Sequence, residues 1–318
     1  MSDEAPLEVA PPDISSHRGA GPIPYLHRLP ARDGAPGPHA VISAIVHGDE
    51  PCGAVVLDRL LRADFRPSRG ALTLIFGNPE AYRRTGPGAR LGVRAAVEDL
   101  NRLWGPEVLT APVRSPEHAR AKALAPEIAT ADALLDLHSM IGDGPAMILA
   151  GREAKGLALA RRLGAPRDIV MDFGHADGVR MRDFGRFADP TDPATALLVE
   201  CGPHYRARTV ACAVETAARF LAALDMLPED GAVLPRPPAP AAAQRVLEVT
   251  HRTTPETQAF RFVEDFQGGE CIPRAGTVVA HDGTDAVATP YDGCVLIMPT
   301  PNAAPGRTAV RFAREVRT

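Results

Sequence analysis

Features typical of nucleic-acid-binding, secreted and membrane proteins are missing from this sequence. The formal net charge is −4 and no basic tract is interleaved with aromatic residues, so nothing indicates nucleic-acid binding. The opening residues MSDEAPLEVA lack the positive and apolar segments of a secretory signal. No apolar run reaches the roughly 18 to 20 residues that span a bilayer. We therefore expect a cytoplasmic protein that binds neither nucleic acid nor a membrane.

Cysteines are few and do not form a disulfide framework. The five cysteines include no CxxC pair and their number is odd, which favours reduced thiols in a cytoplasmic protein. Cys52 and Cys201 lie next to the polar motifs described below, so a thiol nucleophile is the alternative to a packing role. Packing is the stronger interpretation, because a free cysteine commonly behaves as a small buried apolar residue.

The composition of the chain changes near its C-terminal quarter. The 318 residues are 45% hydrophobic, which is enough for a sizeable core in one large or two unequal domains. Residues 1–37 are rich in Pro and Gly and are expected to wrap a surface. Residues 228–243 predict a Pro/Ala linker. The sequence thus predicts a larger domain at 1–227 and a small all-β domain at 244–318, where short β-prone runs alternate with Gly, Pro and Asp.

Short apolar runs alternate with helical patterns in the larger domain. The expected strands are 40–46, 71–76, 133–137, 147–150, 169–171 and 196–199, and the expected helices end at Arg62 or lie near 116–129, 153–164 and 206–225. Nearly all-apolar strands that alternate with helices indicate an α/β sheet covered on both faces. Ligands of such sheets bind beyond the carboxyl ends of the strands, and the polar motifs follow strands at these ends.

The first polar motif is HGDE, in which His47 and Glu50 stand three residues apart at an expected strand-to-helix junction. Side chains at this spacing can face one point on the first turn of a helix. An imidazole nitrogen together with a carboxylate oxygen suits zinc. A loop that caps a helix with acidic residues would give the same pattern, so the motif alone leaves both interpretations open.

The second motif is DLHS, in which Asp136 and His138 alternate along a strand and share one face. The carboxylate could accept the second N–H of the imidazole, as carboxylates beside zinc ligands do. A strand-end histidine alone is more often structural than a ligand. Two nearby ligands and one distant histidine, however, form the recurring arrangement of catalytic zinc, which leaves one coordination position for water.

Two further motifs carry charged side chains. Glu200 ends an apolar strand in VECG, where a carboxylate needs a polar environment. A role as a base beside zinc-bound water would meet that need, and so would a strand-end salt bridge. Arg94 precedes the segment DLNR, which holds Asn101 and Arg102. The planar guanidinium group of an arginine can donate two parallel hydrogen bonds to a carboxylate, and the Asn101 amide adds neutral donors. An isolated Asn-Arg pair, however, does not by itself indicate a binding site.

Taken in order, HGDE, GNP, Arg94 with DLNR, DLHS and VECG resemble the aspartoacylase/succinylglutamate desuccinylase family, which is related to the zinc carboxypeptidases. The motifs span residues 47–202, and the following helix to about residue 225 also fits. Residues 244–318 resemble the family only in position and β character. The resemblance implies an α/β fold with a mixed-sheet, zinc carboxypeptidase-like amidohydrolase domain at 1–227 and a smaller all-β domain after the linker.

The resemblance also implies a role for each matching residue of the reaction centre. His47, Glu50 and His138 match the ligands of one zinc ion per chain. Glu200 matches the catalytic carboxylate. Arg94 lies where the family has an arginine that polarises the scissile carbonyl group.

The implied substrate contacts are less complete. Asn101 and Arg102 match the pair that binds the carboxylate of the amino acid. The family uses another arginine shortly before the catalytic glutamate, but the spacing does not match cleanly here. Arg180, Arg182 and Arg186 are candidates, and Arg186 is nearest in sequence. A tyrosine that the family contributes from its C-terminal domain has no identified counterpart.

The implied function is hydrolysis of the amide bond of an N-acyl amino acid, a small molecule. Zinc-bound water is the expected nucleophile, and Glu200 the expected general base and then acid. A zinc carboxypeptidase acting on short peptides would use the same three ligands. A non-catalytic zinc-binding protein would need neither Glu200 nor Arg94, and the absence of a GxSxG segment disfavours a serine hydrolase. The acyl group, the amino acid and a homo-oligomeric state stay open.

Overall fold

The computed structural model describes residues 7–84, 91–175, 177–229, 233–240, 242–301 and 303–316. Strands before the linker are β1 (Leu26–Pro30), β2 (His39–Ala44), β3 (Ala71–Phe76), β4 (Ala133–Met140), β5 (Met147–Leu149), β6 (Asp168–Met171) and β7 (Thr195–Pro203). Those after it are β8 (Arg245–Thr253), β9 (Phe260–Phe262), β10 (Cys271–Ile272), β11 (Val278–Asp282), β12 (Asp285–Ala288), β13 (Cys294–Ile297) and β14 (Val310–Val316). The helices are α1 (Cys52–Arg62), α2 (Pro79–Arg83), α3 (Pro106–Thr110), α4 (Pro116–Ile128), α5 (Ala154–Leu163) and α6 (Ala207–Ala223).

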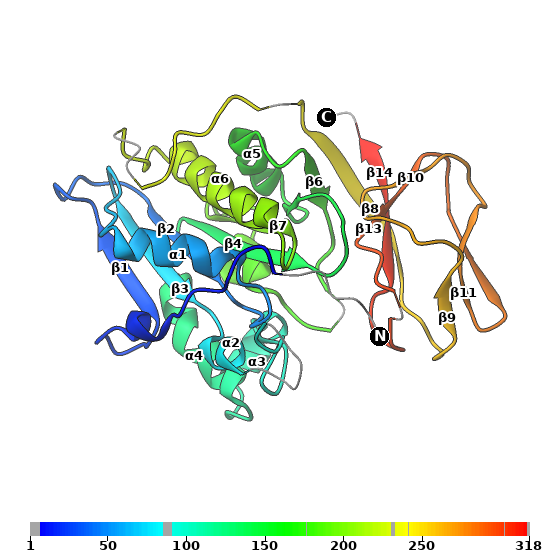
Figure 1. Ribbon diagram of the computed structural model, residues 1–318, viewed down its shortest axis with the longest axis horizontal. Helices are drawn as coiled ribbons and strands as arrows, with labels where there is room; N and C mark the ends of the chain where they lie inside the picture. Colours follow the sequence, from blue (N-terminus) through cyan, green and yellow to red (C-terminus); the bar gives the residue numbers. More distant parts are fainter. Residues whose placement is uncertain are drawn as a thin grey trace.

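One mixed sheet runs through the molecule, as Figure 1 shows. Within the described residues it has 11 strands in the order β1-β3-β2-β4-β7-β5-β6-β8-β14-β13-β10, and a second sheet has the order β12-β11-β9. Strands β3, β2, β4 and β7 are parallel neighbours. β1 runs antiparallel to β3, and β5 runs antiparallel to β7 but parallel to β6. The predicted mixed α/β architecture with a separate all-β region is confirmed.

Helices cover both faces of the parallel strands. Side chains of α1, α5 and α6 join one core with one face of the sheet, and side chains of α4 join a second core on the other face. Strand β4 is buried at every position, which explains its nearly continuous apolar sequence. Cys52 and Cys201 belong to the first core, in agreement with the packing interpretation.

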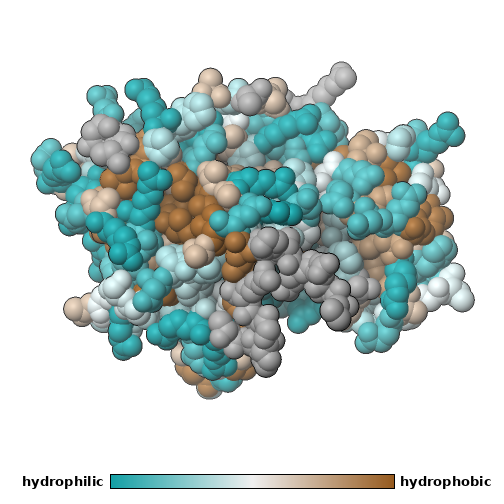
Figure 2. Space-filling model, in the orientation of Figure 1, coloured by the Kyte–Doolittle hydropathy of each residue, from teal (hydrophilic) through white to brown (hydrophobic). Residues whose placement is uncertain are grey.

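The strands after the linker continue the large sheet. β8 pairs in parallel with β6, and β14 pairs antiparallel with β8. Most of the face in Figure 2 is hydrophilic, with apolar side chains gathered over α1 and α6 and over the C-terminal strands. The boundaries 1–227 and 244–318 stay a prediction, because hydrogen bonding across the large sheet joins the two parts. Among the described helices, none is long and apolar enough to cross a bilayer.

The expectation for residues 1–37 was incomplete. Residues 1–6 lie outside the described part, and Leu26–Pro30 form an edge strand that pairs with β3. An edge strand tolerates proline, because one side of its backbone needs no sheet partner. The short helices α2 and α3 and the strand β14 were not predicted, and in β14 charged residues obscure the apolar positions.

Candidate metal and catalytic site

The segment between β2 and α1 is a tight turn. Ile45 has a left-handed backbone with φ of 49°. A Cβ atom on Gly48 would lie 2.3 Å from the carbonyl carbon of Ala81, so only glycine fits there. The first turn of α1 contains no acidic residue and no side chain caps the helix, which rules out the capping interpretation of HGDE. The turn instead brings His47 and Glu50 together.

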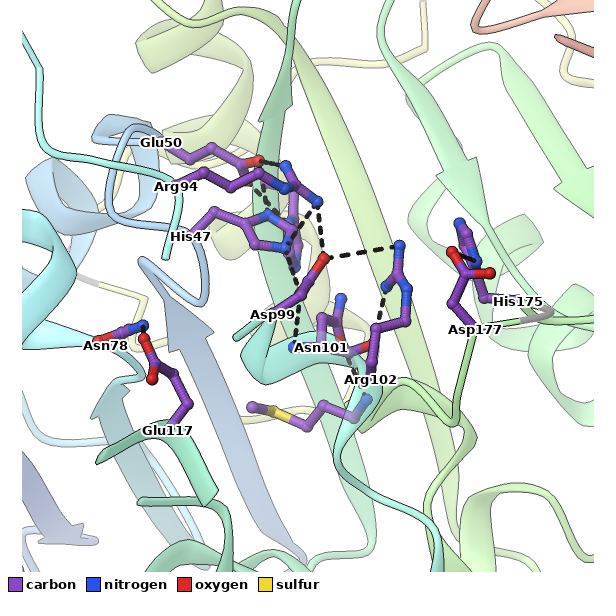
Figure 3. Close-up of polar contacts among 12 residues, drawn as sticks. His47, Glu50, Asn78, Arg94, Asp99, Asn101, Arg102, Glu117, His175 and Asp177 are labelled. Atoms are coloured by element: carbon purple, nitrogen blue, oxygen red, sulfur yellow. Dashed lines mark hydrogen bonds and ion pairs between the residues drawn. The ribbon is translucent and has the colours of Figure 1, made fainter. Parts of the chain in front are cut away.

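Two histidines and a glutamate converge at the carboxyl ends of β2 and β4. One potential ligand atom from each of His47, Glu50 and His138 lies within 4.8 Å of the other two, and all three residues are buried. His47 Nδ1 lies 2.7 Å from Glu50 Oε1, and His138 Nδ1 lies 2.8 Å from Glu50 Oε2. Figure 3 shows His47 and Glu50 directed toward each other. The structure therefore unites the three side chains that the sequence singled out as a group.

Each imidazole places its other ring nitrogen against a carboxylate. His138 Nε2 lies 2.8 Å from Asp136 Oδ2, as the alternation along the strand predicted. His47 Nε2 lies 3.0 Å from Asp99 Oδ1, a partner that the sequence analysis missed. If both Nε2 atoms keep their protons and donate to these carboxylates, the two Nδ1 atoms, which face Glu50, can lose theirs and bind a metal ion. Two imidazoles and one carboxylate thus form a donor set that fits zinc.

The charges of this group depend on one another. Burial alone would raise the pKa of Glu50, but the positive charges of and hydrogen bonds with His47 and His138 lower it well below its ordinary value. Burial would lower the pKa of His138, but the carboxylates of Asp136 and Glu50 raise it well above its ordinary value. A carboxylate held ionised in a buried site is a strong ligand for a cation.

Glu200 lies beside His138, since the parallel pairing of β4 and β7 puts these two residues in register. Burial, followed by the negative charge of Glu50, raises the pKa of Glu200 to about 7. Its Oε2 atom is buried and has no hydrogen-bond partner within the described part of the chain. Glu200 therefore does not form the strand-end salt bridge that was the alternative interpretation of the VECG motif. A buried carboxylate with an unpaired oxygen can accept a proton and return it.

Arg94 approaches the group from the loop before Asp99. Its Nη2 lies 2.9 Å from His47 Nε2 and 3.1 Å from Asp99 Oδ2, and its Nη1 lies 3.5 Å from Glu50 Oε1 (Figure 3). His47 Nε2 cannot donate to Asp99 and accept from Arg94 at once. Arg94 keeps two carboxylate acceptors whichever partner the ring takes. Its guanidinium group is therefore held at the edge of the His-Glu-His group while remaining half-exposed.

Asn101 and Arg102 lie in the 3-10 helix η2 (Leu100–Arg102), for which Asp99 supplies the cap. The Asn101 Oδ1 atom accepts a hydrogen bond from the backbone N–H of Met181 at 2.9 Å. Arg102 Nη1 donates to the Asn101 carbonyl group at 2.8 Å, and Nη2 lies 3.7 Å from Asp99 Oδ2. The Nε of Arg102 is buried without a partner among the residues described. Both side chains retain donors for an anionic ligand.

Arg186 does not lie with the other predicted site residues. It belongs to the 3-10 helix η4 (Gly185–Phe187), and its Nε donates to Asp192 Oδ2 at 2.9 Å. Its Nη1 lies 3.4 Å from the carbonyl oxygen of Ala131, which precedes the amino end of β4. His138 lies toward the opposite end of that strand. Because β7 runs parallel to β4, the residues just before β7 must lie at the amino edge, so nearness in sequence to Glu200 was misleading.

The other two arginine candidates are occupied by the protein itself. Arg180 donates to Asp172 at 2.7 and 2.8 Å and to Asp183 at 2.6 Å. Arg182, in the 3-10 helix η3 (Met181–Asp183), donates to two backbone carbonyl groups at 3.0 Å each. Their guanidinium groups therefore stabilise the loop that follows β6.

A mixed α/β sheet with a His-Glu-His group at the carboxyl ends of its parallel strands defines the class: an α/β protein with a candidate metal site. The sequence profile of the succinylglutamate desuccinylase/aspartoacylase catalytic domain matches residues 36–224. The chain belongs to this family, and the family resemblance in the sequence is confirmed.

Curated relatives match a shorter stretch. A succinylglutamate desuccinylase of Pseudomonas fluorescens is 36% identical over 105 residues, which make up 32% of this chain and 23% of the relative. A succinylglutamate desuccinylase of Ectopseudomonas mendocina is 36% identical over 106 residues. The match thus spans less than a quarter of the length of these relatives.

Solved structures share the fold over nearly the whole chain. The succinylglutamate desuccinylase of Vibrio parahaemolyticus is 19% identical with a TM-score of 0.67, covering 92% of this chain and 87% of that one. The ectoine utilization protein EutE (DoeB) of Ruegeria pomeroyi, in a product-bound structure, is 18% identical with a TM-score of 0.61, covering 91% and 94%. At these identities the likeness shows a common fold.

Proposed function

We propose that this protein hydrolyses the amide bond of an N-acyl amino acid with the help of one zinc ion. The proposal rests chiefly on the convergence of His47, Glu50 and His138 within 4.8 Å, with Glu200 in register beside His138. Curated relatives named succinylglutamate desuccinylase support a small acylated amino acid as the substrate. We further propose that residues 1–227 form the catalytic domain and residues 244–318 a smaller all-β domain.

His47, Glu50 and His138 would hold the ion. Asp99 and Asp136 fix the orientation and tautomer of the two imidazole rings from behind, because each accepts a hydrogen bond from an Nε2 atom. When bound, zinc acts as a Lewis acid that polarises the substrate carbonyl group and makes water more acidic.

Glu200 moves the proton. Its buried, unpaired Oε2 accepts a proton from the attacking water and returns it to the nitrogen of the leaving amine. An amide nitrogen is a poor leaving group until it is protonated, so one carboxylate serves both steps. The position of Glu200 beside His138 supports this role.

Arginine side chains orient the substrate and stabilise developing charge. Arg94, at the edge of the His-Glu-His group, stabilises the negative charge that forms on the carbonyl oxygen. Arg102 binds the carboxylate of the amino acid with Asn101 beside it, which fixes the position of the amide. The unpartnered Nε of Arg102 is one donor for this contact.

A substrate panel tests this function. Zinc-loaded protein would be incubated with N-acetyl and N-succinyl amino acids and with short peptides, and released amine would be measured. We expect turnover of at least one N-acyl amino acid and much slower turnover of peptides. Turnover of peptides alone would favour a carboxypeptidase. No turnover by protein with full zinc occupancy would contradict the proposal.

A further inference from the structure

The loop that carries Arg94 has no buried apolar residue to anchor it. Residues 93–98 belong to no helix or strand, and none of residues 91–99, all of which the structure describes, is buried. Arg94 is half-exposed, and Val97 is 66% exposed. The position of such a loop must be set by polar contacts of its backbone. Because Arg94 lies at the edge of the His-Glu-His group, these contacts bear directly on the candidate reaction centre.

One buried carboxylate supplies two of these backbone contacts. Glu117 lies in the first turn of α4 and is only 1% exposed. Its Oε1 atom accepts the backbone N–H of Ala96 at 2.6 Å and that of Val97 at 3.2 Å. Two adjacent N–H groups that converge on one oxygen atom fix both the position and the direction of the chain that follows Arg94, because hydrogen bonds weaken steeply when their geometry is distorted.

The same oxygen atom joins the loop to the GNP motif. Asn78 Nδ2 donates to Glu117 Oε1 at 3.2 Å, and Figure 3 shows the two side chains directed toward each other. Asn78 is held in turn, because its backbone N–H donates to the carbonyl group of Ile45 at 2.9 Å. The carbonyl group of Arg94 accepts the N–H of Gly48 at 3.1 Å. The loop and the turn that holds the HGDE motif thus share one hydrogen-bond network, which Glu117 connects to α4.

We propose that Glu117 is a positioning residue of the reaction centre: by accepting two backbone N–H groups of the loop, it holds the guanidinium group of Arg94 against the His-Glu-His group. The proposal rests on the proposed hydrolase function, in which Arg94 stabilises the negative charge on the carbonyl oxygen. Glu117 contacts the loop and Asn78, and its effect on the reaction passes through Arg94. A loss of transition-state stabilisation of this kind lowers kcat more than it changes KM.

A second contact keeps the loop attached to α4 when Glu117 is replaced. Glu98 accepts a hydrogen bond from the Ser115 hydroxyl group, and Arg114 donates to Glu98 at 2.9 and 3.1 Å. Loss of the Glu117 contacts should therefore shift the loop without detaching it. A misplacement of about 1 Å can cost on the order of 10²-fold in rate.

Three variants isolate the role of Glu117 as an acceptor. Glu117→Leu removes the oxygen atom that accepts the two N–H groups, whereas Glu117→Gln keeps a carbonyl oxygen that can accept both. Glu127→Leu is the matched control, since Glu127 is a buried glutamate of the same helix whose carboxylate binds Arg28 and Thr73. These two partners belong to β1 and β3, which carry none of the three proposed metal ligands.

Turnover of an N-acyl amino acid by the zinc-loaded proteins gives the first readout. We expect kcat of Glu117→Leu to fall about 10- to 100-fold with little change in KM. The kcat values of Glu117→Gln and Glu127→Leu should stay close to that of the parent. An equal fall in Glu117→Leu and Glu127→Leu would reflect general destabilisation and would overturn the proposal.

A double-mutant cycle tests whether Glu117 acts through Arg94. In the Arg94→Ala protein, Glu117→Leu should cause little further loss of kcat, because the group that Glu117 positions is already missing. Losses that simply add would contradict the proposal. If Glu117→Leu does not fold, Glu117→Asp takes its place in every test, since a carboxylate that is one methylene shorter cannot keep both N–H contacts without a shift of the loop.

Amide hydrogen exchange gives a readout that does not depend on turnover. The N–H groups of Ala96 and Val97 should exchange slowly in the parent, Glu117→Gln and Glu127→Leu proteins, and much faster in Glu117→Leu. Equal exchange in the parent and Glu117→Leu would overturn the proposal. If the zinc-loaded parent hydrolyses no substrate of the panel but slow exchange still requires Glu117, the hydrolase function fails while the anchoring of the loop by Glu117 stands.

Discussion

The His-Glu-His group and the pair formed by Arg252 and Arg311 differ in how their charges are balanced. At the carboxyl ends of β2 and β4, Glu50 lies between two imidazoles, and each ring has a second carboxylate behind it. Between β8 and β14, Arg252 faces Arg311, and among the residues that the structure describes neither guanidinium group forms an ion pair. The first arrangement alternates opposite charges, whereas the second places two like charges opposite each other. The fold thus preorganises the charged groups of the first region with partners on every side, and provides less compensation in the second.

The largest effect is expected at Glu200. Replacement by Gln keeps the shape of the side chain but removes its ability to accept a proton, so turnover should fall by about 10² to 10⁴-fold. Zinc content and melting temperature should match those of the parent, which separates a catalytic role from a structural one. A decrease in kcat of less than about tenfold would remove Glu200 from the proton-transfer role.

Arg180, which is paired with carboxylates, and Arg311, which faces another arginine, should contribute differently to the free energy of unfolding, and denaturant unfolding measures this difference. Arg180→Gln leaves Asp172 as a buried carboxylate without its arginine partner, which should cost about 3–5 kcal/mol. Arg311→Gln removes an unbalanced charge and should cost nothing or stabilise the fold slightly. Equal destabilisation by the two substitutions would mean that Arg311 is a structural residue.

Substitution of Asp99 tests whether the carboxylates that contact the imidazole Nε2 atoms increase the affinity for the metal ion. Asp99→Asn keeps the size of the side chain but loses the charge that accepts from His47 Nε2. Loss of such a partner typically costs about 10- to 100-fold in metal affinity. Competition with a zinc chelator would measure this, and Asp136→Asn should behave alike through His138. Unchanged affinity in both variants would show that the ring tautomers are fixed by other means.

The smallest effect is expected at Arg186. Because its guanidinium group binds Asp192 near the amino end of β4, Arg186→Gln should change kcat/KM by less than about twofold. Arg102→Gln is the comparison, since it removes the donor proposed to bind the substrate carboxylate. A large rise in KM for Arg186→Gln would place its side chain near the substrate and contradict the arrangement described above.

Local spacing explains what the sequence could predict. His47 and Glu50 are joined by one turn, and Asp136 and His138 by strand alternation, so short-range geometry was sufficient for both motifs. Nearly uniform apolar strands likewise indicated a sheet covered on both faces, and the order of the motifs indicated the family.

Relations between distant segments explain what the sequence could not predict. The contact of His47 with Asp99 depends on how the loop before η2 returns to the sheet. The opposition of Arg252 and Arg311 depends on the register of two antiparallel strands, which neither strand encodes alone. Arg186 was chosen by its distance in sequence from Glu200, whereas the direction of β7 places its guanidinium group near the amino end of β4.

Metal content of the purified parent and His138→Ala proteins tests the central claim most directly. We predict one zinc ion per parent chain and little or none in the variant, because His138 is one of the three side chains proposed to hold the ion. Removal of zinc from the parent with a chelator should abolish turnover, and its return should restore it. Full zinc occupancy in His138→Ala, or a parent that purifies without zinc and does not take it up, would contradict the account.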